Sequence, residues 1–113
     1  TLKLMLDINA EWANIYSAMA YPGSQLYQIA LDNHWPLPDS WQGYSQYAYE
    51  SLPLPTKHLT SGQVVAFRDY AFNTYYHSPR YLNMMARKFD METMNHINKM
   101  ASHNLERKYA QFY

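Results

Sequence analysis

The stretch Trp12–Ala20, "WANIYSAMA", is the feature that most limits how this chain can fold. Its residues favour a β-strand, and it runs directly into a turn at Pro22 and Gly23. The sequence offers no second stretch of comparable strand propensity to pair with it. Because a parallel sheet needs each strand flanked by others, a single strand followed by a turn and a helix indicates a fragment of an alternating strand/helix protein.

Helical patterns lie on both sides of this strand. Leu2, Met5 and Leu6 have helical spacing without a capping residue ahead of them, which indicates that the chain enters partway through a helix. After the turn, Ser24 can cap a helix that spans residues 24–33. Residues 1–33 are therefore expected to form one strand-helix unit.

Residues 34–59 are rich in proline, tyrosine and tryptophan. Four prolines exclude a long helix and favour extended backbone. The aromatic side chains make the segment too apolar for a free linker, so we expect an ordered connector that lies against the body of the protein. A short strand could form near residues 45–49.

Three consecutive amphipathic helices are expected in residues 60–113. Thr60 and Gln63 have the spacing of a capping box. Ser78 precedes a proline suited to a first helical turn, and Asp90 can cap the third helix. The expected apolar stripes are, in chain order, Val64, Phe67, Ala71 and Tyr75; Leu82, Met85, Ala86 and Phe89; and Met94, Ile97, Ala101 and Leu105. The predicted fold is mainly α, within the α+β class.

Composition indicates a folded domain. The chain has 113 residues, of which 48% are hydrophobic and 17% aromatic. Nine basic and nine acidic side chains give a formal net charge of zero, so there is no general electrostatic reason to expect nucleic acid as a partner. No apolar run approaches the roughly 20 residues of a membrane span. A cytoplasmic location is the default expectation.

Residue spacing alone predicts no reaction. The chain has no cysteine, which excludes a disulfide, a thiolate nucleophile and a cysteine-ligated cluster within it. Its carboxylates show no paired spacing and its three glycines are isolated, so neither an acid/base pair nor a phosphate-binding loop is supported. His96 and His103 lie two helical turns apart, too far to share one metal ion without other ligands. We therefore expect no catalytic or metal-binding residue.

The order of several motifs carries more information than the composition. "AEWANIYSAMAYPGSQLY", "WQGYSQYAYESLPLPTKHLT", "VVAFRDYAF" and "SPRYLNMMARKF" follow one another along the chain. This order resembles the C-terminal portion of cobalamin-binding-domain radical S-adenosylmethionine (SAM) proteins. The group most similar is that of the anaerobic magnesium-protoporphyrin IX monomethyl ester oxidative cyclase, a family of Fe-S oxidoreductases. The resemblance covers nearly the whole chain.

The resemblance implies an architecture. Residues 10–21 would be the last strand of a partial parallel (β/α) barrel, and the residues after 33 would be a C-terminal extension that closes and covers it. The expected segments are 1–33, the terminal strand-helix unit; 34–59, the connector; and 60–113, the helical extension. The family's enzymes use a 4Fe-4S cluster, SAM and cobalamin. The family's CxxxCxxC motif is missing here, so the fragment alone would not be catalytic and would hold none of these cofactors.

The strand also suggests candidate ligand-facing residues in the whole enzyme. Alternation places Trp12, Asn14, Tyr16, Ala18 and Ala20 on one face, and Ala13, Ile15, Ser17, Met19 and Tyr21 on the other. The first face carries more polar groups and is assigned to the barrel interior, the second to the surrounding helices. Since catalytic groups of such barrels collect at the C-terminal ends of strands, the candidates are Asn14, Tyr16, Tyr21, Pro22 and Gly23.

Two classes of function follow. In the first, the partner is an upstream radical SAM barrel of the same chain, and the isolated fragment has an open strand edge. That edge would pair with residues 45–49, self-associate, or lie loosely against the helices. In the second, the chain is a self-sufficient helical interaction module with a tyrosine-rich docking surface.

Overall fold

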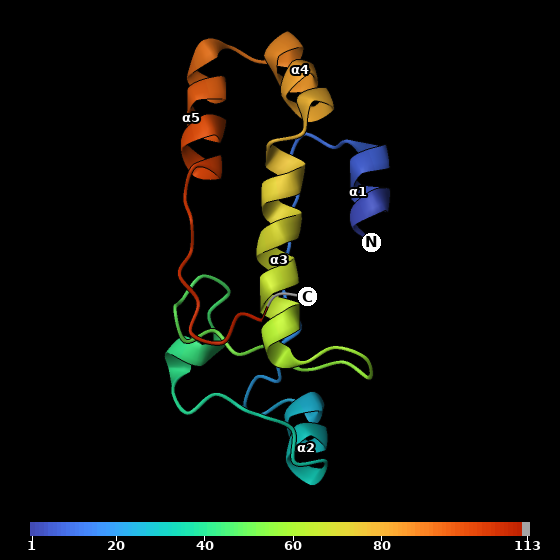
Figure 1. The fold of residues 1–113 in the computed structure, drawn as a ribbon, viewed down its shortest axis with the longest axis vertical. Helices are drawn as coiled ribbons and strands as arrows, with labels where there is room; N and C mark the ends of the chain where they lie inside the picture. Colours follow the sequence, from blue (N-terminus) through green and yellow to red (C-terminus); the bar gives the residue numbers. More distant parts are fainter. Residues whose placement is uncertain (112–113) are drawn as a thin grey trace. The chain divides into compact units, whose positions relative to one another are not determined.

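A computed structural model describes residues 1–111 and shows a mainly helical chain, as the sequence predicts (Figure 1). The helices are α1 (Leu2–Ile8), α2 (Gln25–Asp32), the 3₁₀-helix η1 (Trp41–Tyr44), α3 (Ser61–Tyr76), α4 (Pro79–Lys88) and α5 (Met91–Ala101). None of these helices is both long enough and apolar enough to cross a bilayer.

The strands predicted over residues 12–20 and 45–49 are wrong for this chain, because residues 1–111 contain no strand. Residues 12–20 have no neighbouring strand with which to form a backbone ladder. Side chains take the place of that ladder, as described below. An isolated segment of high strand propensity therefore stays without regular secondary structure, since propensity depends on the pairing context.

The described chain forms two compact units, each of which draws on both ends of the sequence. The first unit comprises residues 1–15 and 70–104, and the second comprises residues 16–69 and 105–111. The boundary between them falls within α3. The division of the chain into segments 1–33, 34–59 and 60–113 stays a prediction.

Tyrosine side chains form much of the core of the first unit. Tyr75, Tyr76 and Tyr81 are at most 3% exposed, and their ring centroids lie 5.1–5.3 Å apart. Met85 and Ile97 complete the centre of this cluster from α4 and α5. Tilted and edge-to-face rings at this spacing are favourable arrangements for aromatic packing.

The hydroxyl groups of the same tyrosines bind the backbone that follows α1. Tyr75 donates to the carbonyl of Ala10, and Tyr81 donates to that of Glu11 at 2.8 Å. Tyr76 donates to the carbonyl of Ala13 at 2.7 Å and accepts from its N–H at 3.0 Å. Each buried ring thus satisfies its own polar group and a backbone group at once.

The second unit uses an amide in a similar way. Gln46 accepts a hydrogen bond from the N–H of Ser17 at 2.8 Å and donates to its carbonyl at 2.9 Å. The carbonyl of Ala18 accepts from the N–H of Leu54 at 2.9 Å. Residues 1–111 show no strand pairing between the segment after α1 and residues 45–49, and the contact between the two is made by the side chain of Gln46. A small apolar core of this unit contains Ala20, Ala30 and Leu54.

A buried guanidinium connects the last described residues to the rest of the second unit. Arg107 has a side chain that is 2% exposed and binds both oxygens of Asp69, at 2.9 and 3.0 Å. It also donates to the carbonyls of Gln46 and Ala48 at 2.7 and 3.0 Å. The planar guanidinium suits this combination of a two-pronged carboxylate contact and backbone contacts.

The predicted helix starts are largely confirmed. Thr60 and Gln63 form the reciprocal capping box, and the side chains of Ser24 and Asp90 cap α2 and α5. The N–H of Thr93 lowers the pKa of the Asp90 carboxyl by hydrogen bonding to it. Ser78 lies at the predicted cap of α4, but its side chain accepts no capping hydrogen bond.

The predicted apolar stripes are only partly correct. Several of their members are buried: Ala71, Tyr75, Met85, Ile97 and Ala101. Phe67 and Phe89 are instead 37% and 42% exposed. Leu105 lies outside α5, which ends at Ala101 where the hydroxyl of Ser102 donates to the carbonyl of Lys99. The stripes also missed Tyr76 and Tyr81, which lie next to the chosen positions Tyr75 and Leu82 and are buried.

Replacing Tyr76 by phenylalanine should destabilise the first unit. The change keeps the ring but leaves the N–H and carbonyl of Ala13 without the hydroxyl, which should cost about 1–3 kcal/mol. Urea unfolding followed by circular dichroism measures this loss, and amide exchange at Ala13 should accelerate. As a control, Tyr49→Phe changes an exposed tyrosine and should alter stability by less than about 0.5 kcal/mol. Equal stability of the two variants would contradict this role of Tyr76.

The protein should lose stability in alkaline solution. Burial raises the pKa of Tyr75 and Tyr81 above the ordinary tyrosine value of about 10. Above that pH the unfolded chain releases these protons and the folded chain keeps them, so the free energy of unfolding falls as the pH rises. Urea midpoints at several pH values between 8 and 11 measure the slope, and Tyr81→Phe should make it shallower. A midpoint that stays constant up to pH 11 would show the expectation to be wrong.

Candidate functional site

An aromatic pocket of about 230 Å³ lies at η1 in the second unit. Side chains three residues apart eclipse each other in a 3₁₀-helix, so Trp41 and Tyr44 lie on the same side, with ring centroids 6.0 Å apart. The residues that line this aromatic pocket are Pro22, Tyr27, Pro38, Asp39, Ser40, Trp41 and Tyr44.

Gly43 allows the chain to fold tightly at this point. A β-carbon on this buried glycine would lie 2.3 Å from that of Pro38, so any larger residue would clash. The backbone of Gly43 donates to the carbonyl of Ser40 at 3.1 Å and accepts from the N–H of Leu52 at 2.9 Å. The close contact between Pro38 and Gly43 positions two walls of the aromatic pocket.

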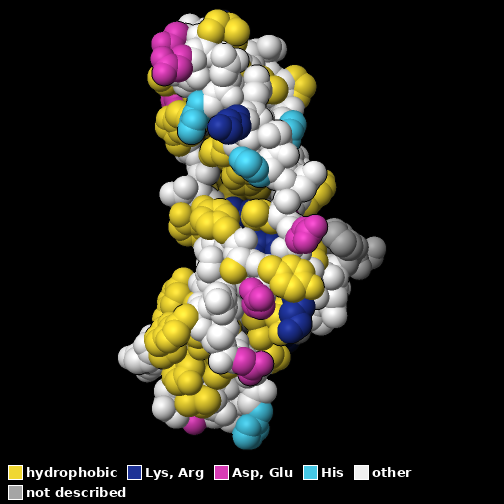
Figure 2. All heavy atoms as spheres, turned by 90° about the vertical axis from the view of Figure 1, so that its left-hand side faces the viewer, with side chains coloured by type: hydrophobic (Ala, Val, Ile, Leu, Met, Phe, Trp, Pro, Cys, Tyr) yellow, Lys and Arg dark blue, Asp and Glu magenta, His cyan; other side chains and the backbone are white. Residues whose placement is uncertain are grey.

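The rings of the aromatic pocket differ in exposure. Trp41 is 78% exposed, whereas Tyr44 and Tyr27 are half-buried. Burial, and secondarily the nearby Tyr27, raise the pKa of Tyr44. Figure 2 shows a group of hydrophobic side chains, coloured yellow, in the lower part of the view. The indole of Trp41 is thus an accessible aromatic surface beside a more enclosed phenol.

Three predicted site residues lie at the turn before α2. Pro22 lines the aromatic pocket, and Tyr21 stacks on Tyr44 with a centroid distance of 5.8 Å. Gly23 has a φ of 89°, a conformation that favours glycine. The hydroxyl of Ser24 donates to the carbonyl of Tyr21 at 2.6 Å and closes the turn. The structure therefore brings Tyr21 and Pro22 to one site.

The other two predicted site residues lie elsewhere. Tyr16 is 59% exposed and packs edge-on against Tyr47, whose hydroxyl raises the pKa of Tyr16 by hydrogen bonding. The guanidinium of Arg68 lies 5.1 Å from the centre of the Tyr47 ring. Asn14 is exposed and belongs to the first unit, so it is not part of the aromatic pocket.

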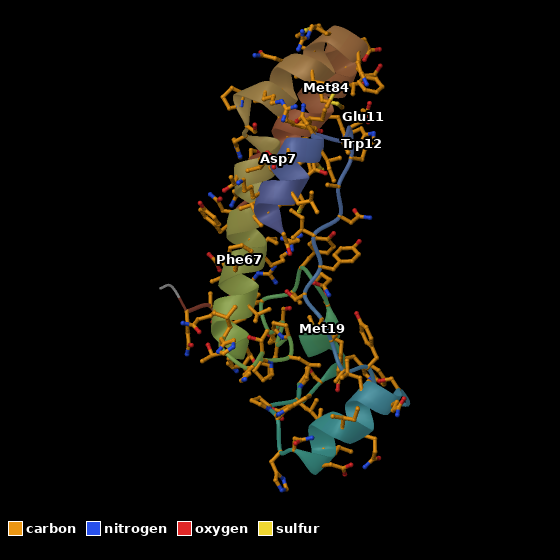
Figure 3. The ribbon with its side chains drawn as sticks, turned by 90° about the vertical axis from the view of Figure 1, so that its right-hand side faces the viewer. Asp7, Glu11, Trp12, Met19, Phe67 and Met84 are labelled. Carbon is orange, nitrogen blue, oxygen red and sulfur yellow. The ribbon has the colours of Figure 1, made fainter. Side chains whose placement is uncertain are left out.

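Exposed and buried residues alternate along the segment after α1, as the sequence predicts, up to Met19. The exposed residues are Trp12, Asn14, Tyr16 and Ala18, and the buried or half-buried ones are Ala13, Ile15, Ser17 and Met19. Figure 3 labels one member of each set, Trp12 and Met19. The pattern reverses at the end, where Ala20 is buried and Tyr21 is 50% exposed. The predicted alternation therefore ends at Met19 and does not include Ala20 and Tyr21.

Sequence reasoning missed most of the aromatic pocket. Tyr27 is predicted only as part of the helix over residues 24–33, and Asp39, Trp41 and Tyr44 only as part of the connector, whose aromatic side chains are expected to lie against the body of the protein. The available signal was "WQGY", in which two aromatic residues three apart enclose a glycine. That pattern fits a 3₁₀ turn with both rings on one side.

The residues present do not fit an iron-sulfur cluster. Such clusters are held by cysteine thiolates, and this chain has no cysteine. Within residues 1–111, no three His, Asp or Glu side chains are grouped closely enough to hold a metal ion. Any cluster associated with this segment would have to take its ligands from another part of a longer protein.

No protein-family model, curated protein or solved structure matches this chain. Inferences about function therefore rest on the residues of this chain and their geometry.

Substituting Gly43 by alanine should damage the aromatic pocket. The added methyl group overlaps Pro38 at 2.3 Å, so backbone must shift, at a cost of about 1–3 kcal/mol. Thermal unfolding by circular dichroism measures the loss, and the NMR signal of the Trp41 indole N–H should shift. Glu50→Ala, at an exposed position of the same connector outside η1, serves as the control and should change stability by less than about 0.5 kcal/mol. Identical melting of both variants would exclude a tight contact at Gly43.

Proposed function

We propose that this chain is the C-terminal segment of a cobalamin-binding-domain radical SAM enzyme similar to the anaerobic oxidative cyclase group. Its role is to close and cover a barrel encoded upstream. The chain's own residues provide packing and the rim of the site, and the chemistry belongs to the cluster, SAM and cobalamin held elsewhere. The enzyme works in the cytoplasm.

The sequence motifs from Ala10 to Phe89 support this proposal by their order. The single observation in the structure that favours it is the segment after α1, where exposed and buried residues alternate from Trp12 to Met19 as in an extended strand. Its side facing the helices is packed by Ala13 and Ile15. The alternate side chains, Trp12, Asn14 and Tyr16, are exposed, and in the proposed enzyme this face would be the one that contacts a ligand.

The turn that follows also suits the rim of a barrel. In such enzymes the functional groups collect where strands end, and Tyr21, Pro22 and Gly23 lie directly after this segment. Tyr21 is half exposed and Pro22 lines the aromatic pocket. Both are available at the place where the proposed enzyme would bind its substrate.

A second candidate function is a helical interaction module. It is favoured by the exposed aromatic residues of the second unit, among them Trp41 at 78%, Tyr47 at 54% and Tyr49 at 51%. Aromatic residues at this level of exposure are enriched at protein interfaces.

The upstream reading frame separates the two candidates. A preceding barrel with three clustered cysteines is expected for the radical SAM enzyme. The whole protein, purified without oxygen, should then show iron-sulfur absorption and cleave SAM. A version that ends before Thr1 should keep the cluster but lose most SAM cleavage, because the barrel would lack its closing segment.

Two outcomes would contradict the proposal. One is a stop codon or an unrelated domain directly upstream, which would favour the interaction module. The other is full SAM cleavage by the version that lacks residues 1–113. A Gln42→Ala form of the whole protein, which changes an exposed position, is the matched control for activity lost during purification.

A further inference from the structure

The chemistry of the aromatic pocket indicates which ligand it can bind. Three aromatic rings, two prolines, one hydroxyl and one carboxylate line it, and no basic residue does. Asp39 is exposed and has no ion-pair or hydrogen-bond partner within residues 1–111. Its charge is therefore available to a ligand, and it is the only formal charge among the lining residues.

We propose that the aromatic pocket binds a methylated ammonium group, such as the trimethylammonium head of choline. A cation is attracted to the faces of Trp and Tyr rings, most strongly to Trp. Its methyl groups would contact Pro22 and Pro38, while Asp39 supplies the opposite charge. This inference rests on the second unit alone and does not depend on the proposed function.

The size of the aromatic pocket limits the ligand. Its volume of about 230 Å³ lies below the roughly 300–1,000 Å³ typical of sites for drug-sized molecules. It therefore suits a compact head group better than a whole nucleotide or tetrapyrrole. Trp41 is largely exposed at the side of the site, so the head group of a larger molecule can enter while the remainder stays in solvent.

Titration with choline chloride tests the proposal, with the indole N–H of Trp41 followed by NMR. The neutral molecule 3,3-dimethylbutan-1-ol has the same shape without the charge and should bind at least about fivefold more weakly. A second titration uses phosphatidylcholine vesicles. Comparing the two titrations shows whether the ligand is a lipid head group or a free solute. Binding in either titration supports the proposal. Absence of binding in both, or equal affinity for the neutral molecule, would overturn it.

Two variants localise the binding. Asp39→Asn keeps the size of the side chain and should weaken choline binding about fivefold, and Trp41→Leu should abolish it. Tyr49→Leu removes an exposed ring that does not line the aromatic pocket and should leave affinity unchanged. Circular dichroism of each variant shows whether the helices persist. Unaltered affinity in Asp39→Asn with intact helices would show that the site does not select for charge.

Discussion

The hydroxyl groups of three buried tyrosines are the contacts on which the first unit depends. The segment after α1 lacks a strand partner, and its carbonyls at Ala10, Glu11 and Ala13 would otherwise be left without hydrogen bonds beside an apolar core. A phenylalanine core would supply similar packing but no donors. Three of the twelve tyrosines of this chain thus have a structural explanation in this unit.

In the second unit, other side chains provide the hydrogen bonds that the backbone of the segment after α1 needs. Gln46 presents a donor and an acceptor to Ser17, which is the pattern that a neighbouring strand would present. Arg107 holds the backbone around Gln46 and Ala48 and pairs with Asp69, whose carboxylate also binds Arg68. The connector is thereby ordered by polar side chains as much as by its apolar residues.

Local signals predicted the parts of the fold that depend on neighbours in sequence. The caps at Ser24, Thr60 and Asp90 act within three residues, so sequence spacing reveals them. The strand at residues 12–20 could not be judged in this way, because strand formation depends on a partner far along the chain. Of the site, Tyr21 and Pro22 were predicted from their place after the strand, whereas Asp39 and Trp41 were not. Their grouping depends on the close approach of Pro38 and Gly43, which no periodic pattern in the sequence reveals.

The Arg107 contacts have a consequence for the order in which the chain can fold during synthesis. The ribosome releases residues 16–69 well before Arg107, so the carbonyls of Gln46 and Ala48 have no guanidinium partner until Arg107 has been made. The carbonyl of Gly62 likewise waits for the N–H of Gln111, which donates to it at 3.0 Å. α3 can form early from its own capping box, but the second unit closes only after residues 105–111 have been made. Contacts of such high sequence separation slow folding, because a long loop must close before they form.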